Sequence, residues 1–189
     1  MADAPKILFI DAATYFGWAY GPAGSAPISG SRYFAKGSGA SRGAIFAGAM
    51  RFIAEMIQEH GTDIHIFIEA PLPTILVQGS TNIDTSEILM GIPAALWGMA
   101  YTMGCYNVQL CRVSAIRKHF IGKNSKGEIA KPLVMQKCIK LGWIKMGDED
   151  MKHDRSDALA GWSYAEHQIA PRLSQPIDDL FLKRGGRIQ

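Results

Sequence analysis

The amino-acid sequence predicts an α/β protein with a mixed sheet, in which three antiparallel strands are followed by parallel additions and helices cover both faces. Short apolar runs rich in β-branched residues come early, at 6–11, 16–21 and 29–35, and lie close enough along the chain for an antiparallel meander. Longer segments with apolar residues at helical spacing then alternate with further short apolar runs. This alternation is typical of crossover helices that feed parallel strands.

The first crossover helix is expected at residues 41–60, because Ser41 supplies an N-cap and Gly61 supplies a stop. The later elements continue the alternation, with two short helices inserted before the last one. We expect a strand at 64–69, a helix at 84–103, a strand at 106–111, helices at 114–119 and 131–141, and a final helix at 154–170. One domain is therefore expected over residues 1–170, followed by a C-terminal tail at 171–189.

Composition favours a soluble protein of the cytoplasm. The chain has 189 residues, of which 48% are hydrophobic and 20% charged. It contains neither the long apolar run of a membrane span nor the pattern of a signal peptide, so no membrane partner is expected. Its cysteines, Cys105, Cys111 and Cys138, are odd in number and match no zinc or redox spacing, which predicts reduced, buried thiols.

The distribution of basic residues indicates a polyanionic partner. The net charge is only +3 and the pI about 8.8, but Lys and Arg crowd the segment 112–145, in which Glu128 is the only acidic residue. A segment of this kind can hold phosphates. The alternative is a solvated, charged helix face.

Four acidic residues predict a metal site. Asp11 and Glu69 each end an apolar strand, and ligands gather at such strand ends in α/β sheets. Asp154 and Asp157 open the last helix, where their spacing places them on neighbouring faces of the first turn. Carboxylates are the ligands that Mg²⁺ prefers. Alternatively, Asp11 and Glu69 are turn or surface residues, Asp154 caps the helix and Asp157 favours its dipole.

The segments around these acids resemble the three acidic motifs of RuvC-type Holliday junction resolvases. They read Ile7-Leu-Phe-Ile-Asp11, Ile66-Phe-Ile-Glu69 and Asp154-Arg-Ser-Asp157-Ala-Leu-Ala160, and the likeness covers most of residues 6–167. The resemblance implies a ribonuclease H-like fold, a homodimer and cleavage of four-way junction or other branched DNA. It also implies that Asp11, Glu69, Asp154 and Asp157 are the catalytic residues and bind a pair of Mg²⁺ ions, for which Mn²⁺ is expected to substitute.

The same resemblance implies a set of DNA-binding residues. Arg117 and Lys131 fall where the family has basic residues near the scissile phosphate, and Lys118 and Lys123 lie in the same stretch. Leu72 lies in the loop where the family carries a residue that wedges open the junction; packing or a dimer contact is the alternative. The turn after Asp11 is similar to that of phage-borne resolvases.

The sequence therefore predicts a metal-dependent endonuclease that resolves branched DNA in recombination, repair or phage DNA processing, with one ion generating hydroxide and the other stabilising the leaving 3′ oxygen. A YqgF-like ribonuclease acting on structured RNA is one alternative, because the same fold and acids serve it. A non-catalytic module that binds branched DNA is another. His153, beside Asp154, is expected to be a surface or capping residue.

Overall fold

A computed structural model describes residues 3–36, 39–71, 83–148 and 150–174. Five strands form one sheet in the order β3-β2-β1-β4-β5. The strands are β1 (Lys6–Asp11), β2 (Tyr15–Pro22), β3 (Ile28–Tyr33), β4 (His65–Glu69) and β5 (Val108–Cys111). The helices are α1 (Arg42–His60), α2 (Ile83–Thr102), α3 (Val113–Ile121), α4 (Gly127–Lys140) and α5 (His153–Ile169).

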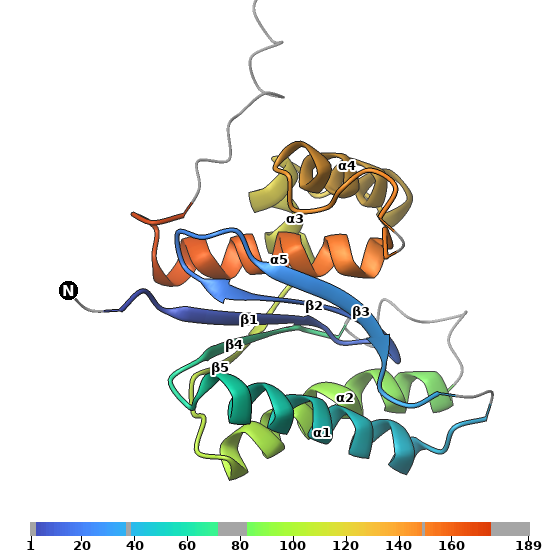
Figure 1. Cartoon of the computed structure of the whole chain (residues 1–189). Coiled ribbons are helices and arrows are strands. Elements are labelled where there is room, and N and C mark those ends of the chain that lie inside the picture. The colour runs from blue at the N-terminus through green and yellow to red at the C-terminus, as the bar shows by residue number, and fades with distance from the viewer. Residues whose placement is uncertain (1–2, 37–38, 72–82, 149, 175–189) are drawn as a thin grey trace, which may run out of the picture.

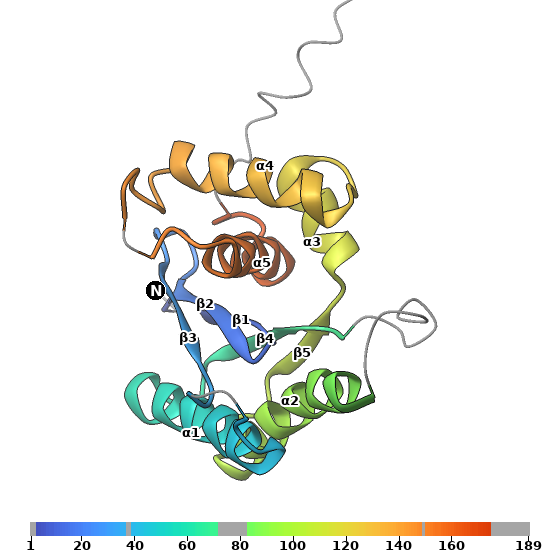
Figure 2. The ribbon, with the colours of Figure 1, turned by 90° about the vertical axis from the view of Figure 1, so that its right-hand side faces the viewer.

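The predicted mixed sheet is confirmed. β2 pairs antiparallel with both β1 and β3, whereas β1–β4 and β4–β5 are parallel pairs. Helices α1 and α2 cover one face, and α5 covers the other (Figure 1). The side view in Figure 2 shows α4 outside α5, so this second layer is two helices deep. The central strands β1 and β4 are therefore enclosed on both faces.

Burial along β1 follows from this enclosure. Its four apolar residues, Ile7 to Ile10, are all buried, although successive side chains point to opposite faces. Leu8 and Ile10 pack in the cluster formed with α1 and α2. Ile7 and Phe9 pack in the cluster formed with α3, α4 and α5. The strand thus reads as a continuous apolar run because each face has its own core.

Helix α5 lies unusually close to β1. Gly161 faces the Phe9 ring, and a Cβ on this glycine would lie 2.2 Å from the ring carbons. The neighbouring Trp162 is fully buried and donates its indole N–H to the Ile7 carbonyl at 3.2 Å. A small residue and an indole hydrogen bond therefore fix the distance between helix and strand.

The element boundaries differ from the expected ones mainly at α4, which begins at Gly127 rather than at residue 131. Gly127 and Pro132, which lies inside the helix, have poor helix propensity, so the sequence pattern did not indicate where α4 begins.

The predicted buried, reduced cysteines are confirmed. Among the described helices, none combines the length and apolar character that crossing a membrane requires.

Replacing Gly161 by Ala is expected to destabilise the fold. The added methyl group must displace the fully buried Phe9 ring, and overpacking of this kind costs about 1–3 kcal/mol. Gly43→Ala in α1 is the matched control, because its new Cβ would meet only Ser41 Oγ, at 3.9 Å. Urea denaturation should show a lower free energy of unfolding for Gly161→Ala alone. Equal loss in both variants would show that the close approach is not a constraint.

Candidate active site

Asp11 and Glu69 end neighbouring strands at the same edge of the sheet. In the parallel ladder between β1 and β4, Ile10 is opposite Ile68, so the next residue on each strand is one of the two acids. The chain does not continue either strand beyond them. The two carboxylates predicted at strand ends are therefore neighbours, although β2, β3 and α1 lie between the two strands along the chain.

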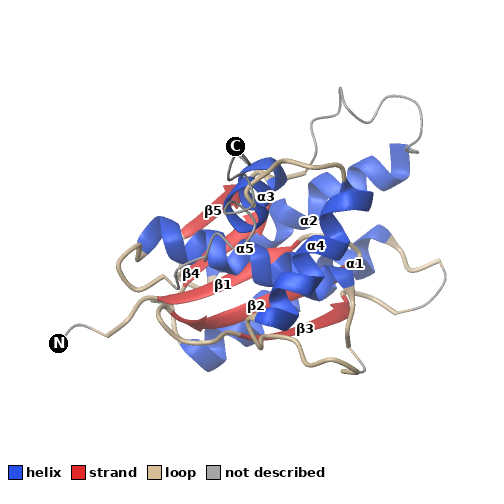
Figure 3. Ribbon diagram, turned by 90° about the horizontal axis from the view of Figure 1, so that it is seen from above, coloured by secondary structure: helices blue, strands red, loops and turns tan. Residues whose placement is uncertain are grey.

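Gly17 brings the first turn of α5 to this edge. The antiparallel pairing of β1 and β2 places Gly17 opposite Asp11. A Cβ on Gly17 would lie 1.9 Å from the backbone oxygen of Asp154, so only glycine leaves room for the helix. Figure 3, which looks down on this face, shows α5 lying over the strands. The start of α5, which carries Asp154 in its first turn and Asp157 just after it, consequently lies beside Asp11.

Asp154 does not cap helix α5. The helix begins at His153, its N-cap residue is Lys152, and no side chain donates or accepts a capping hydrogen bond there. Asp154 instead lies within the first turn, where a carboxylate interacts favourably with the helix dipole. The capping alternative for this residue is wrong, and its side chain is not committed to the backbone of its own helix start.

Arg155 holds the start of α5 in place. Its side chain is only 12% exposed. It donates to Ser29 Oγ of β3 at 2.9 Å and to Asp148 Oδ2 at 2.7 Å. Asp150 Oδ2 in turn accepts the backbone N–H of Ser31 in β3 at 2.8 Å. The segment before α5 is thereby tied to the edge strand.

Sequence analysis missed both Gly17 and Arg155. Nothing around Gly17 distinguishes it from an ordinary strand glycine, because its partner lies on a distant helix. Arg155 stands shortly after Asp148 and Asp150, and this charge complementarity is a signal that could have indicated an ion pair. The pairing also holds the pKa of Asp148 below its usual value, chiefly through the hydrogen bond from Arg155.

The four acids interact electrostatically. Burial is the main cause that raises the pKa of Asp11 well above its usual value, and repulsion from Glu69, Asp157 and Asp154 raises it further. Lys131 opposes the shift. The structure thus brings the predicted acids into one group, here called the acid group, which consists of Asp11, Glu69, Asp154 and Asp157.

The pKa values of Glu69 and Asp157 are also raised. Burial and repulsion from Asp157 raise the pKa of Glu69 to about 7, against the attraction of Arg117 and Lys131. Burial raises the pKa of Asp157 to about 6, and the same two cations oppose this shift. Shifts with this origin cluster at functional sites. A bound cation would stabilise the charged forms of these carboxyls and so oppose the shifts.

Two of the predicted basic residues lie near the acid group. Arg117 of α3 and Lys131 of α4 are both close enough to lower the pKa of Glu69 and Asp157. Arg117 also donates to the Ser125 carbonyl at 3.1 Å, which links α3 to the segment before α4. His153, expected at the surface, is exposed and also lowers the pKa of Asp157.

The remaining predicted DNA-binding residues lie further out or outside the described chain. Lys118 is exposed on α3, and Lys123 is exposed in the segment between α3 and α4. Neither is among the cations that lower the pKa of the acid group. Leu72 lies outside the described residues.

The acid group has the donor chemistry of a divalent-cation site. Its ligands are carboxylate oxygens, which suit Mg²⁺ or Mn²⁺ better than softer metals. In the part of the chain that the structure describes, no three His, Cys, Asp or Glu side chains are close enough to hold one ion as they stand. Three acids would therefore bind one ion only after their side chains turn toward one another.

The fold defined by this sheet and helix order is ribonuclease H-like. Among solved structures, that of Thermus thermophilus RuvC is similar with a TM-score of 0.62 and 11% identity, over 86% of this chain and 95% of that chain. The structure of T. thermophilus RuvC in complex with Holliday junction substrate is similar with a TM-score of 0.62 and 12% identity, over 89% and 96%. No protein-family model matches the sequence, and no curated protein matches it. The chain therefore has a RuvC-like fold, which is recognised from the structure rather than from sequence identity.

Stability of the metal-free protein is expected to fall as pH rises from about 4.5 to about 7. Carboxyls whose pKa is raised by folding bind protons more tightly in the native state, so raising the pH through this window favours unfolding. Asp157→Asn should flatten the profile. Thermal unfolding across this range measures it, and Mg²⁺ should raise the melting temperature more at about pH 8 than at about pH 5.

If the melting temperatures of the parent and of Asp157→Asn changed with pH by the same amount, this electrostatic account would be contradicted. Asp63→Asn is the matched control, because Asp63 is exposed and paired with Lys6 at 3.1 Å, away from the acid group. Its profile should keep the slope of the parent.

Proposed function

We propose that this protein is a divalent-metal-dependent endonuclease that cleaves branched DNA, with the four-way junction as its substrate. The observation that carries the proposal is the acid group at one edge of a RuvC-like sheet, in which burial, together with repulsion between the acids, raises the pKa of Asp11 and Glu69. One similar structure is of a RuvC in complex with Holliday junction substrate. The adjoining Arg117 and Lys131 carry the positive charge that would bind the phosphates of a nucleic acid.

The acids would bind the metal ions, and two further residues would position the acids. Asp11, Glu69, Asp154 and Asp157 would hold a pair of Mg²⁺ ions, which when bound supply an activated water and stabilise the leaving oxygen. Asp11 interacts with all the other members of the acid group, since each of the three raises its pKa. Arg155 and Gly17 act indirectly, by setting where the first turn of α5 lies.

The basic residues would hold the DNA. Arg117 and Lys131 lie beside the acid group and would bind oxygens of the cleaved phosphate or of its neighbour. Lys118 and Lys123 are exposed on and after α3, where they would contact flanking phosphates. Arg117 and Lys131 also offset part of the repulsion within the acid group.

Asp11→Asn is expected to abolish cleavage while binding of the junction survives, because the substitution removes metal-binding charge and leaves the basic residues in place. Nicking assays on a synthetic four-way junction, beside duplex, flap, RNA and RNA/DNA hybrid substrates with and without Mg²⁺, measure this. Asp63→Asn should cleave like the parent, since Asp63 is exposed and paired with Lys6.

The substrate panel also separates the alternatives. Preferential cutting of structured RNA would replace the proposal with a YqgF-like ribonuclease. Junction binding without cleavage in Mg²⁺ or Mn²⁺ would indicate a binding module. Near-normal Mg²⁺-dependent cleavage by rigorously purified Asp11→Asn protein would contradict the role of the acid group.

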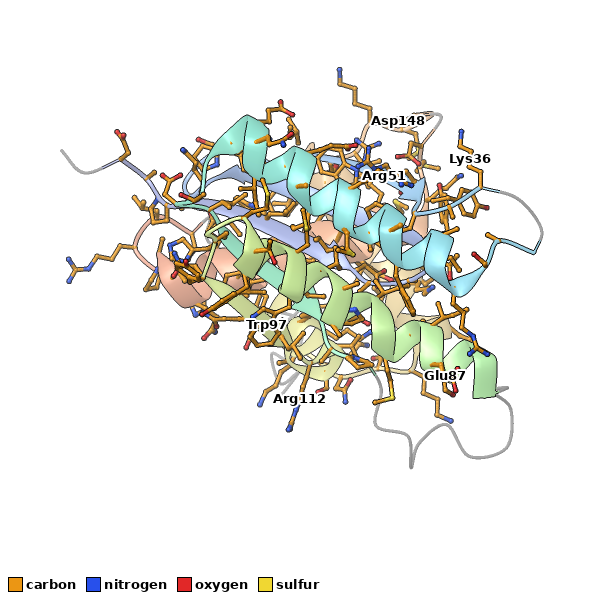
Figure 4. All side chains as sticks on the ribbon, turned by 90° about the horizontal axis from the view of Figure 1, so that it is seen from below. Lys36, Arg51, Glu87, Trp97, Arg112 and Asp148 are labelled. Carbon is orange, nitrogen blue, oxygen red and sulfur yellow. The ribbon has the colours of Figure 1, made fainter. Side chains whose placement is uncertain are left out.

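We also propose that the protein acts as a homodimer joined through α2. The exposed side of this helix carries large apolar residues at helical spacing: Met90 is 54% exposed, Trp97 40% and Tyr101 64%. Trp97 lies on the side of α2 that faces away from α1 (Figure 4). Tyr106 and Leu110 extend this face to β5, the edge strand. A two-fold dimer would present a pair of active sites to a symmetric junction.

The double variant Trp97→Glu/Tyr101→Glu is expected to be monomeric, because two carboxylates would be buried in the apolar interface. Sedimentation velocity measures the change, and Met50→Glu on the exposed side of α1 is the control. The double variant should still nick one strand of the junction, but it should no longer cut two strands within a single complex. A parent protein that sediments as a monomer, both free and on junction DNA, would overturn the dimer.

A further inference from the structure

Lys152 and Tyr15 form a charged contact near the acid group that the proposed function leaves unused. Lys152, the residue before α5, donates to the hydroxyl of Tyr15 in β2 at 2.6 Å, and its Nζ lies 4.5 Å from the centroid of the Tyr15 ring. The ring of Tyr33 in β3 packs against that of Tyr15, with the centroids 4.4 Å apart. The exposed ammonium of Lys152 is therefore fixed at one place on the surface.

This contact lies on the same face and at the same end of the sheet as the acid group. Phe16 of β2 packs in the cluster formed with α1 and α2, so its neighbours Tyr15 and Gly17 face α5. Gly17 is opposite Asp11, and Tyr15 lies two residues nearer the turn between β1 and β2, a distance of roughly 7 Å. At ~3.4 Å per nucleotide, this corresponds to about two nucleotides of a DNA strand.

The cations already assigned to the DNA approach the acid group from other elements. Arg117 belongs to α3, which follows β5 at the opposite edge of the sheet from β3 (Figure 2). Arg117 and Lys131 lower the pKa of two members of the acid group, and Lys152 is not among the residues that do so. Lys152 therefore lies further from the metal-binding carboxylates and would contact a different phosphate.

Within the described chain, no carboxylate forms an ion pair with Lys152. The partner of its ammonium is the neutral hydroxyl of Tyr15, and this hydrogen bond is the main cause that raises the pKa of Lys152. Asp148 and Asp150, which precede it, accept hydrogen bonds from α5 and from β3. An ammonium has three N–H donors, so donors remain for an anion after the hydroxyl has accepted one.

We infer that Lys152 binds a phosphate of the cleaved DNA strand, on the β3 side of the acid group. The inference rests on the proposed function, since it names a further contact of the same substrate. A lysine side chain loses conformational freedom when it is ordered. Because Tyr15 already fixes the ammonium, less freedom would be lost on binding the phosphate. The strand would thus be held on both sides of the cut, by Arg117 and by Lys152.

The test is a binding experiment in the Asp11→Asn background, in which the strand is not cut. Fluorescence anisotropy would measure the affinity for four-way junctions that carry a single neutral methylphosphonate linkage, moved one position at a time along the strand near the crossover. Each junction is bound to the background protein, to Lys152→Ala and to Lys152→Arg. Arg51→Ala is the matched control, because Arg51 is an exposed cation on α1, which covers the other face of the sheet (Figure 4).

Lys152→Ala should weaken binding of the unmodified junction by about three- to fivefold at low salt, as expected for one exposed ion pair. It should also reduce the slope of log affinity against log salt concentration by about one, because fewer counterions are released. At one position, the loss caused by the neutral linkage should not add to that of Lys152→Ala, since both remove the same contact. Lys152→Arg and Arg51→Ala should keep the salt slope of the background protein.

A purely structural role of Lys152 would give a different result. If its side chain only positioned the start of α5, the loss from Lys152→Ala would add to that of every neutral linkage. Lys152 is the N-cap residue of α5 but makes no side-chain capping hydrogen bond, so the helix start does not depend on it for a cap. Thermal unfolding checks that each variant is folded.

Tyr15→Phe tests whether the position of the ammonium matters as well as its charge. The variant removes the hydroxyl that accepts from Lys152. It should therefore weaken binding of the junction while keeping the salt slope. Tyr33→Phe is its control, because it removes a neighbouring hydroxyl and leaves the hydrogen bond between Lys152 and Tyr15 in place.

The inference is overturned if the losses from Lys152→Ala and from the neutral linkages add at every position, or if Lys152→Ala has the affinity and salt slope of the background protein. Its failure is distinguishable from failure of the proposed function. Normal cleavage by the parent with no coupling at Lys152 would overturn the phosphate contact alone. Coupling at Lys152 in a protein that never cleaves DNA would support the contact and contradict the nuclease. A protein that binds no DNA would overturn both.

Discussion

The close approach of helix α5 to strands β1 and β2 is the constraint on which the acid group depends. At Gly17 the helix backbone occupies the space where a Cβ would be, and at Gly161 the Phe9 ring does so. The indole hydrogen bond of Trp162 to Ile7 sets the same distance from within the core. Without this contact, Asp154 and Asp157 would lie above the sheet and away from Asp11.

This geometry places negative charge where it is unfavourable for the metal-free fold. Burial and mutual repulsion raise the pKa of Asp11, Glu69 and Asp157, and the nearby Arg117 and Lys131 offset only part of the effect. A site for divalent cations needs several carboxylates close together. These repel one another in the metal-free protein, but each attracts a bound cation. The fold tolerates the acid group because the apolar clusters on both faces of the sheet stabilise the elements that carry it.

Local patterns were sufficient to predict the strands, the order of the elements and the acids at their ends. The run Ile7-Leu-Phe-Ile and the stop after Glu69 reveal both the strand and its end, and parallel pairing then makes neighbours of the two carboxylates. The start of α4 was predicted wrongly because Gly127 and Pro132 are poor helix formers, and tertiary packing of Ala130, Val134 and Cys138 outweighs their propensity. The role of Gly17 could not be predicted, because it is defined by a contact with a distant helix. The nearby Asp148 is a local signal for the ion pair of Arg155, but its bond to Ser29 joins residues far apart in the chain.

The central claim is that the acid group binds divalent cations at the point where DNA is cut. Anomalous diffraction from crystals grown with Mn²⁺ and a four-way junction containing non-hydrolysable linkages tests it most directly. The account predicts a pair of Mn²⁺ peaks roughly 3.5–4 Å apart, bound by Asp11, Glu69, Asp154 and Asp157 and bridged by one phosphate of the junction. Junction bound with no Mn²⁺ at these residues, or with Mn²⁺ only elsewhere on the protein, would contradict it.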